Sequence, residues 1–224
     1  MNSAEGSADV PRRTSWLMRI WRGIKIFLVL FVILFVAGLI WRYPGYLEKE
    51  RSAEVAQKIR DARLTMADAD GSNLPPQPDP ALVDATVEGI DANRNGIRDD
   101  VELAIFAKYP GVENLKLRAA ELQYAKALQT VFLSFTKETL TASAWEQSRA
   151  YFCIDSISPK LPITASDEEW RAIDVVFKRR INEITDLVLN TAARSQRYED
   201  AYDKYMSSHA SPASNYCDVM APSN

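Results

Sequence analysis

The segment DANRNGIRDDVE, residues 91–102, places oxygen-bearing side chains at alternate positions and then reaches a glycine. Calcium needs six or more oxygens around one point. A twelve-residue loop supplies them when its first, third, fifth, ninth and twelfth side chains carry oxygen and its seventh residue offers a carbonyl. The predicted Ca²⁺ ligands are therefore Asp91, Asn93, Asn95, the Ile97 carbonyl, Asp99 and Glu102. Gly96 is sixth, where a sharp turn favours positive φ.

At these positions the segment resembles the EF-hand loop and, more closely, the acidic calcium repeats of thrombospondin type 3 and dockerin-like proteins. The resemblance covers twelve to about thirty of the 224 residues, so it implies a bound ion and not a function for the whole protein. It departs from the EF-hand at the eighth position, where Arg98 replaces the apolar residue that pairs with a sister loop. We expect a structural ion clamp of weak affinity, roughly 10⁻⁴ to 10⁻³ M, as in extracellular modules.

A metal-free interpretation uses the same residues. Asn95-Gly96 is a turn signal, and Asp99 with Glu102 fits the N-cap and third-residue acid of the next helix. The alternation of Asp91, Asn93 and Asn95 before Gly96 favours calcium, because a simple turn does not need it.

An apolar run near the N-terminus predicts a membrane anchor. Residues 26–41 contain no charge, and a helix from Trp21 to Trp41 would be roughly 30 Å long, enough to cross a bilayer. Five basic and two acidic residues precede the run, a net charge of +3, whereas residues 42–224 carry a net charge of −6. The positive-inside bias places the N-terminus in the cytoplasm. A cleaved signal peptide is the alternative, although no small-residue cleavage site precedes Trp41.

These features predict five parts: a cytoplasmic basic tail (1–25), a transmembrane anchor (26–43), a helical stalk (44–66), a Pro-rich linker (67–79) and a helical extracytoplasmic domain (80–224). Pro44-Gly45 is expected to end the spanning helix. Asp79-Pro80 is expected to begin a short helix that runs to about Glu88.

The outer part has helical spacing almost throughout, with apolar stripes from Leu115 to Phe135 and from Trp170 to Tyr205. Ser143 with Glu146, and Ser166 with Glu169, fit capping boxes and predict two helix starts. The expected class is all-α, an irregular antiparallel bundle.

Cys153 and Cys217 both fall on the outer side, where thiols are normally oxidised, so we expect a disulfide; two buried free thiols are the alternative. His209 is the single histidine and lies in a polar tail, and we expect no enzymatic activity. Tyr198, Tyr202 and Tyr205 either line a ligand groove or pack in the core beside a wet edge.

The expected function is binding or scaffolding, as a membrane-tethered module with a protein partner in the cell envelope. The predicted location is the inner (cytoplasmic) membrane, where the helix meets lipid and the domain is periplasmic or extracellular. A ligand-binding or sensory helical domain is the first alternative, and a carboxylate-dependent hydrolase is the second. The acidic outer part does not favour a nucleic-acid partner. Residues 178–180 form a basic triplet, expected to be a solvated helix face or a site for anionic lipid or an acidic patch.

Overall fold

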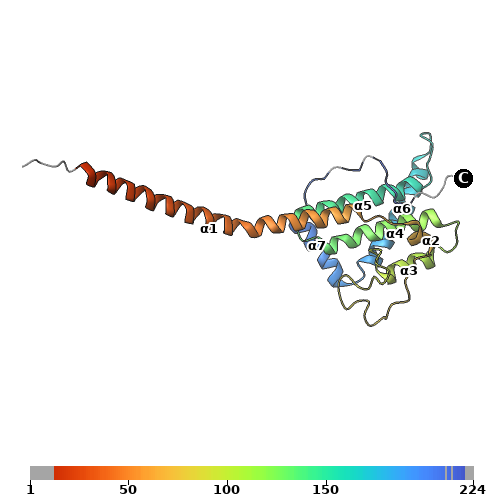
Figure 1. Ribbon diagram of the computed structural model, residues 1–224. Helices are drawn as coiled ribbons and strands as arrows, with labels where there is room; N and C mark the ends of the chain where they lie inside the picture. Colours follow the sequence, from red (N-terminus) through yellow and green to blue (C-terminus); the bar gives the residue numbers. More distant parts are fainter. Residues whose placement is uncertain (1–12, 210, 213, 220–224) are drawn as a thin grey trace, which may run out of the picture. The chain divides into compact units, whose positions relative to one another are not determined.

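The computed structural model describes residues 13–209, 211–212 and 214–219, so the first part of the predicted basic tail lies outside the described residues. Within them every regular element is helical and no strand occurs, which confirms the all-α class. Figure 1 shows the helices, whose bounds are α1 Arg13–Asp61, α2 Met66–Asp70, α3 Asp99–Lys108, α4 Leu115–Gln129, the 3₁₀ helix η1 Thr130–Leu133, α5 Lys137–Ile157, α6 Asp167–Val188 and α7 Ala192–Tyr205.

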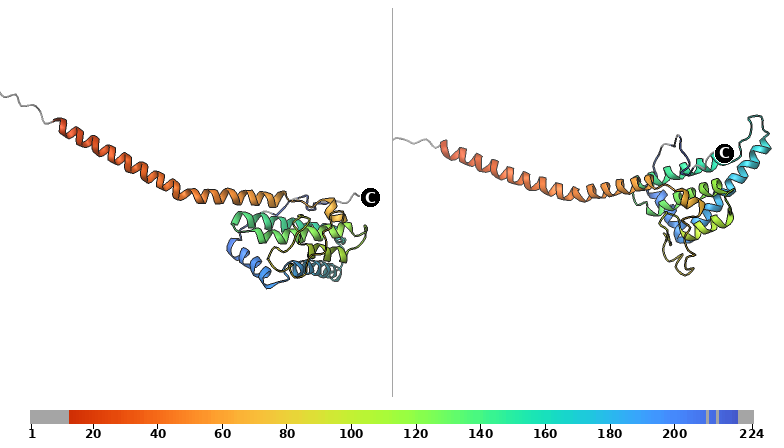
Figure 2. Two further views of the ribbon diagram at one scale, coloured as in Figure 1. Left: turned by 60° about the horizontal axis from the view of Figure 1, so that its bottom comes forward. Right: turned by 45° about the vertical axis from the view of Figure 1, so that its right-hand side comes forward.

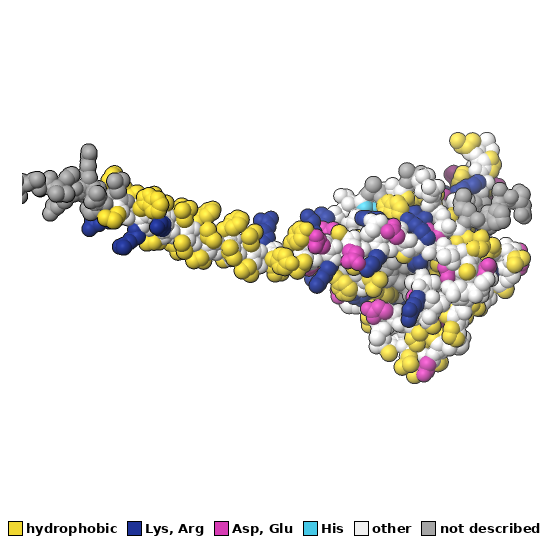
Figure 3. Space-filling model, viewed as in Figure 1, with side chains coloured by type: hydrophobic (Ala, Val, Ile, Leu, Met, Phe, Trp, Pro, Cys, Tyr) yellow, Lys and Arg dark blue, Asp and Glu magenta, His cyan; other side chains and the backbone are white. Residues whose placement is uncertain are grey.

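The chain divides into two compact units, Met1–Glu50 and Arg51–Asn224. The described part of the first unit is the portion of α1 up to Glu50, in which the large hydrophobic side chains from Met18 to Tyr46 are exposed. In Figure 3 hydrophobic side chains make up most of the coloured surface of this stretch, with a few basic side chains among them. Its most apolar window has a mean hydropathy of 2.8, and among the described residues α1 is the one helix long and apolar enough to cross a membrane.

The prediction that Pro44-Gly45 ends the first helix is wrong, because α1 continues through both residues to Asp61. An internal proline removes one backbone hydrogen bond and costs about 3 kcal/mol. Strong helix formers follow the proline, and tertiary contacts made by the last turns of α1 offset this cost. Ala56 and Ile59 are buried against Ala142 of α5.

The segments expected to be a stalk and a linker contribute to the second unit, which begins at residue 51 and not near residue 80. Leu64 belongs to the main core. Thr65 and Asp68 form a capping box that starts α2, and Gly71 ends it in the left-handed conformation with φ 94°. Short-range capping therefore makes a helix at the start of a stretch that composition alone predicts to be extended.

The helix expected from Asp79 to about Glu88 is absent, and turns and bends occupy these residues. The buried Arg194 of α7 explains the difference. Its guanidinium donates to the carbonyls of Val83 at 2.8 Å and Val87 at 2.9 Å, groups that an α-helix would use internally.

Of the two predicted capping boxes, Ser166 with Glu169 is confirmed at the start of α6. The box at Ser143 is wrong, because α5 already begins at Lys137, after a capping box made by Thr136 and Thr139. Ser143 is instead buried within α5, where its hydroxyl lies 2.9 Å from that of Ser134.

Both long apolar stripes are interrupted. The stripe that begins at Leu115 leaves the α-helix at Gln129 and continues as η1. The stripe that begins at Trp170 is broken between α6 and α7, where the Thr191 hydroxyl caps the backbone N–H of Arg194. A hydroxyl N-cap competes with helix continuation, and the break turns Arg194 inward.

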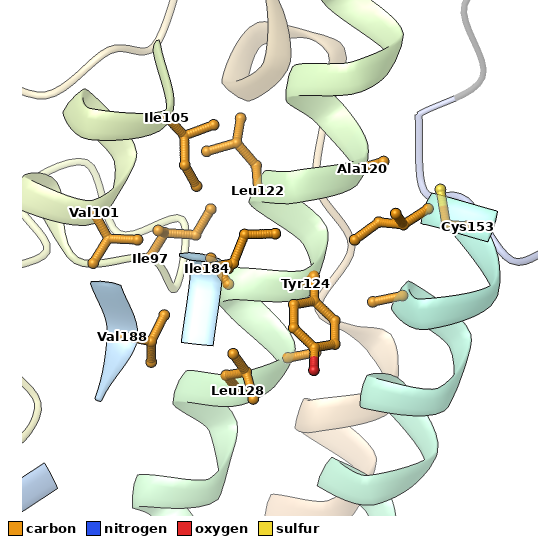
Figure 4. Packing of buried hydrophobic residues seen from close by; sticks show 14 of the residues in the cluster. Ile97, Val101, Ile105, Ala120, Leu122, Tyr124, Leu128, Cys153, Ile184 and Val188 are labelled. Atoms are coloured by element: carbon orange, nitrogen blue, oxygen red, sulfur yellow. The ribbon is translucent and has the colours of Figure 1, made fainter. Parts of the chain in front are cut away.

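The core lies between α3, α4, α5 and α6. Figure 4 shows Ile97, Val101 and Ile105 facing Leu122 and Leu128 of α4, with Ile184 and Val188 nearby. Helices α4 and α5 lie side by side in both views of Figure 2, joined by η1. The expected Cys153–Cys217 disulfide is present and attaches the C-terminal segment to α5.

Candidate functional site

The predicted calcium loop begins in irregular backbone and ends in the first turn of α3, and two buried arginines bind it and the segment before it. Arg98, the residue that departs from the EF-hand pattern, is 1% exposed. Its guanidinium donates to the carbonyls of Val188 at 3.0 Å and Leu187 at 3.1 Å and pairs with Asp100 at 2.7 Å. The eighth loop position thus attaches the loop to the end of α6, in place of a contact with a sister loop.

Arg194 of α7 likewise attaches the segment before the loop to the rest of the domain. Besides the carbonyls of Val83 and Val87, it pairs with Asp84 at 2.5 Å. Gly89, with φ 70°, allows the two arginines to approach, because a Cβ there would overlap the Arg98 side chain. In the sequence Arg98 is marked only by its departure from the EF-hand pattern, and Arg194 is not marked, because its carbonyl partners lie more than one hundred positions earlier in the chain.

Four of the predicted ligand residues converge. Glu102 Oε2 accepts hydrogen bonds from Asn93 Nδ2 at 3.1 Å and Asn95 Nδ2 at 3.0 Å. Asp91 Oδ1 and Asn93 Oδ1 both accept the backbone N–H of Asn95, at 3.2 and 3.3 Å. Gly96 has the expected positive φ, 88°, and its N–H donates to Asp91 Oδ2.

The ninth and twelfth positions carry buried oxygens without partners. Asp99 is 1% exposed; its Oδ1 accepts the Ala92 N–H at 3.0 Å, but its Oδ2 accepts no hydrogen bond. Glu102 is fully buried, and its Oε1 is likewise unpartnered. Burial raises the pKa of Glu102 to about 7 and also raises the pKa of Asp99.

The metal-free capping role of Asp99 is not observed. The N-cap of α3 is Arg98, without a side-chain cap, and Asp99 turns its carboxylate toward Ala92 in the loop. Ile97 keeps its side chain in the core, and its N–H donates to Asn95 Oδ1 at 2.8 Å.

The acidic side chains of the loop do not by themselves form a complete set of cation ligands. Among the described residues no group of three or more His, Cys, Asp and Glu side chains is arranged to hold a metal ion. A metal in this loop would therefore depend on the amides of Asn93 and Asn95 and on a backbone carbonyl. Rotation of each amide by half a turn would present its oxygen where its NH₂ group now meets Glu102.

A cavity of about 610 Å³ adjoins the loop, and Asp91, Gly96 and Ile97 contribute to its wall. Lys126 of α4 contributes to the same wall. It is 9% exposed, its Cε would lie 3.1 Å from a Cβ on Gly96, and burial lowers its pKa.

The other residues considered in the sequence have structural partners. Tyr198 and Tyr202 stack with centroids 4.8 Å apart, and both hydroxyls donate to Gln147, while Tyr205 packs against a buried cluster. Tyr202 also borders a smaller cavity of about 260 Å³ with His209, whose Nε2 lies 3.2 Å from the Ser148 hydroxyl.

In the basic triplet, Lys178 pairs with Asp174, Arg179 with Glu183 and Arg180 with Glu121. The first two pairs are exposed, as expected of a solvated helix face, whereas Arg180 reaches a buried carboxylate.

Comparison of the chain with protein-family models, with curated proteins and with solved structures finds no match in any of the three.

Proposed function

We propose that this chain is a single-pass membrane protein whose helical domain, on the side opposite the basic N-terminal tail, carries one structural Ca²⁺ ion in loop 91–102. The domain acts as a binding or scaffold module in the cell envelope. The apolar part of α1 and the charge difference between residues 1–25 and 42–224 support the anchor and its orientation. The disulfide supports an oxidising compartment for the domain.

One observation carries the calcium proposal: Asp99 Oδ2 and Glu102 Oε1 are buried in the loop without any hydrogen-bond donor. Leaving a buried polar atom unpaired costs about 1–3 kcal/mol, and more for a charged group. Calcium prefers carboxylate, amide and carbonyl oxygens, which are the groups the loop contains. A bound cation would compensate the charge of both carboxylates at once. Arg98 and Arg194 would fix the backbone of the loop and of the segment before it in the conformation that binds the cation.

The test is thermal unfolding of the oxidised full-length chain in lipid nanodiscs, with chelator and then with 10 mM calcium. For a dissociation constant of roughly 10⁻³ to 10⁻⁴ M, ligand linkage gives about 1.4 to 2.7 kcal/mol of stabilisation. For a domain of this size that is a rise in Tm of about 3 to 10 °C.

Two variants make the result specific. Glu102→Gln keeps the shape of the side chain but removes its charge, and it should abolish the calcium response. Glu88→Gln changes an exposed acid just before the loop and should keep the full response. Equal melting temperatures of the wild-type chain in calcium and in chelator would refute the calcium proposal and leave the loop as a turn held by Arg98.

A further inference from the structure

The cavity beside the loop is enclosed by segments far apart in the sequence. Val55 and Ile59 come from the last turns of α1, Ile97 comes from the loop, and Phe132 and Leu133 come from η1. At about 610 Å³ it lies within the range of small-molecule sites, about 300 to 1,000 Å³. Leu133 and Phe135 are 48% and 60% exposed and lie where the cavity reaches the surface. These hydrophobic side chains would accommodate the apolar part of a small molecule.

Two polar groups on α4 contribute to the same wall without partners. Lys126 makes no hydrogen bond or ion pair within the described residues, although it is 9% exposed. Gln129 is 8% exposed; its Oε1 accepts the Arg98 N–H at 3.0 Å, but its Nε2 donates to nothing. The two residues are three positions apart, so they lie on one face of α4. A buried donor without an acceptor, such as Gln129 Nε2, is rare in folded proteins.

The acidic groups around Lys126 do not fill that role. Asp218, Asp68, Asp91 and Glu146 attract its ammonium, but none lies within ion-pair distance. Asp218 and Glu146 already pair with Arg149, and both Asp91 oxygens accept loop N–H groups. Burial is accordingly the largest influence on the Lys126 pKa and lowers it, which shows that the positive charge is poorly compensated.

We propose that this cavity binds a single-chain fatty carboxylate, with its two head-group oxygens on Lys126 Nζ and Gln129 Nε2 and its alkyl chain along the apolar wall of Ile59 and Phe132. A carboxylate offers two acceptor oxygens to the two unpartnered donors, and hydrogen bonds from an ammonium to a carboxylate are among the strongest in proteins. A flexible alkyl chain suits walls built of aliphatic and phenyl side chains. The inference goes beyond the calcium proposal, because it needs no bound metal.

The test is photolabelling of the full-length chain in phosphatidylcholine nanodiscs, with and without calcium. The probe is dodecanoic acid carrying a diazirine near its methyl end. Mass spectrometry locates the labelled residues, and labelling of the apolar part of α1, which needs no specific site, normalises each sample. We expect strong labelling of Phe132, Leu133 and Phe135, and competition by unlabelled dodecanoate. The methyl ester of the probe should label these residues about tenfold less, because it cannot form the charge-assisted contact.

Two substitutions on α4 separate recognition from partitioning into the bilayer. Lys126→Met keeps the apolar stem, and labelling at the cavity should fall about tenfold while labelling of the apolar part of α1 is unchanged. Lys116→Met changes an exposed lysine of the same helix, outside the cavity wall, and should leave cavity labelling unchanged. The circular dichroism of each variant verifies its fold.

Equal cavity labelling by acid and ester would overturn the proposal, and that comparison needs no variant. Labelling confined to the apolar part of α1 would also overturn it, as would undiminished labelling in a folded Lys126→Met chain. Because labelling is compared with and without calcium, a failed calcium site and a failed lipid site give different results. An unchanged melting temperature identifies the first, and absent cavity labelling identifies the second.

Discussion

Buried carboxylates occur in two regions of the helical unit, and the two regions compensate them differently. Between the helices, Glu121 forms salt bridges with Lys108 at 3.3 Å and Arg180 at 3.2 Å and accepts a hydrogen bond from the Tyr109 hydroxyl at 2.5 Å. Glu146, on the α5 side, pairs with Arg63 at 2.7 Å and with Arg149 at 2.9 Å. One Glu146 oxygen has no hydrogen bond, but two guanidinium groups balance its charge.

In the loop, Asp99 and Glu102 are just as buried, yet neither has a salt bridge with a cationic side chain of the described residues. Their partners are amides and backbone N–H groups. Lysine and arginine side chains therefore balance the buried acids of the core, whereas only hydrogen bonds from amide and backbone N–H groups reach the two buried acids of the loop. The following predictions test that contrast.

The largest effect is expected from Arg149→Met. Arg149 pairs with Glu146 and Asp218 and donates to the carbonyls of Asn215 and Tyr216. Removing one partner of a buried ion network strands the others, and we expect a loss of about 3–5 kcal/mol in the free energy of unfolding, measured with urea. Adding Glu146→Gln should recover part of the loss. A loss below about 1 kcal/mol would show that this region is no better compensated than the loop.

The second effect is a pH dependence of the metal-free protein. In the folded state the Glu102 pKa is about 7, above its ordinary value of 4.5, so the folded chain binds this proton more tightly than the unfolded chain. The resulting stabilisation is fully present below about pH 4.5 and is lost as the pH rises through about 7. The size of the shift corresponds to about 3 kcal/mol.

The measurement is urea unfolding in chelator at pH 5 and pH 8, for the wild-type chain and for Glu102→Gln. The variant lacks the titrating group, so its stability should fall less over this range, and at pH 8 it should be about 2 kcal/mol more stable than wild type. If the free energy of unfolding changes equally with pH in the two chains, the Glu102 carboxylate is not an uncompensated buried charge. In saturating calcium the difference should shrink, because a bound cation favours the charged carboxylate.

The smallest effect is expected at an exposed pair. Lys178 and Asp174 lie 2.7 Å apart on α6, with side chains 69% and 53% exposed. Exposed helix pairs contribute about 0.3–0.5 kcal/mol, so Lys178→Met should change the free energy of unfolding by no more than that. A larger loss would mean that burial is not what separates the important ion pairs from the others.

Local signals predicted several elements well. Ser166 and Glu169 start α6 as expected, Gly96 has its positive φ, and the two cysteines are bonded. Each of these depends on residues near in sequence or, for the cysteines, on their being the only pair. Helix boundaries that depend on distant contacts were missed. Arg194 binds carbonyls more than one hundred positions earlier in the chain, and no local pattern indicates that contact.

The sequence by itself determined the helical class, the apolar stretch of α1 and the spacing of the oxygen-bearing loop residues, because these depend on periodicity and composition along the chain. Only the tertiary structure decided which charges are buried. It compensated Arg98 with carbonyls at the end of α6 and left Lys126 beside a cavity, without a hydrogen-bond or ion-pair partner among the described residues. A charged side chain looks the same in sequence whether it lies in water or in the core, and the difference arises only when distant segments pack around it.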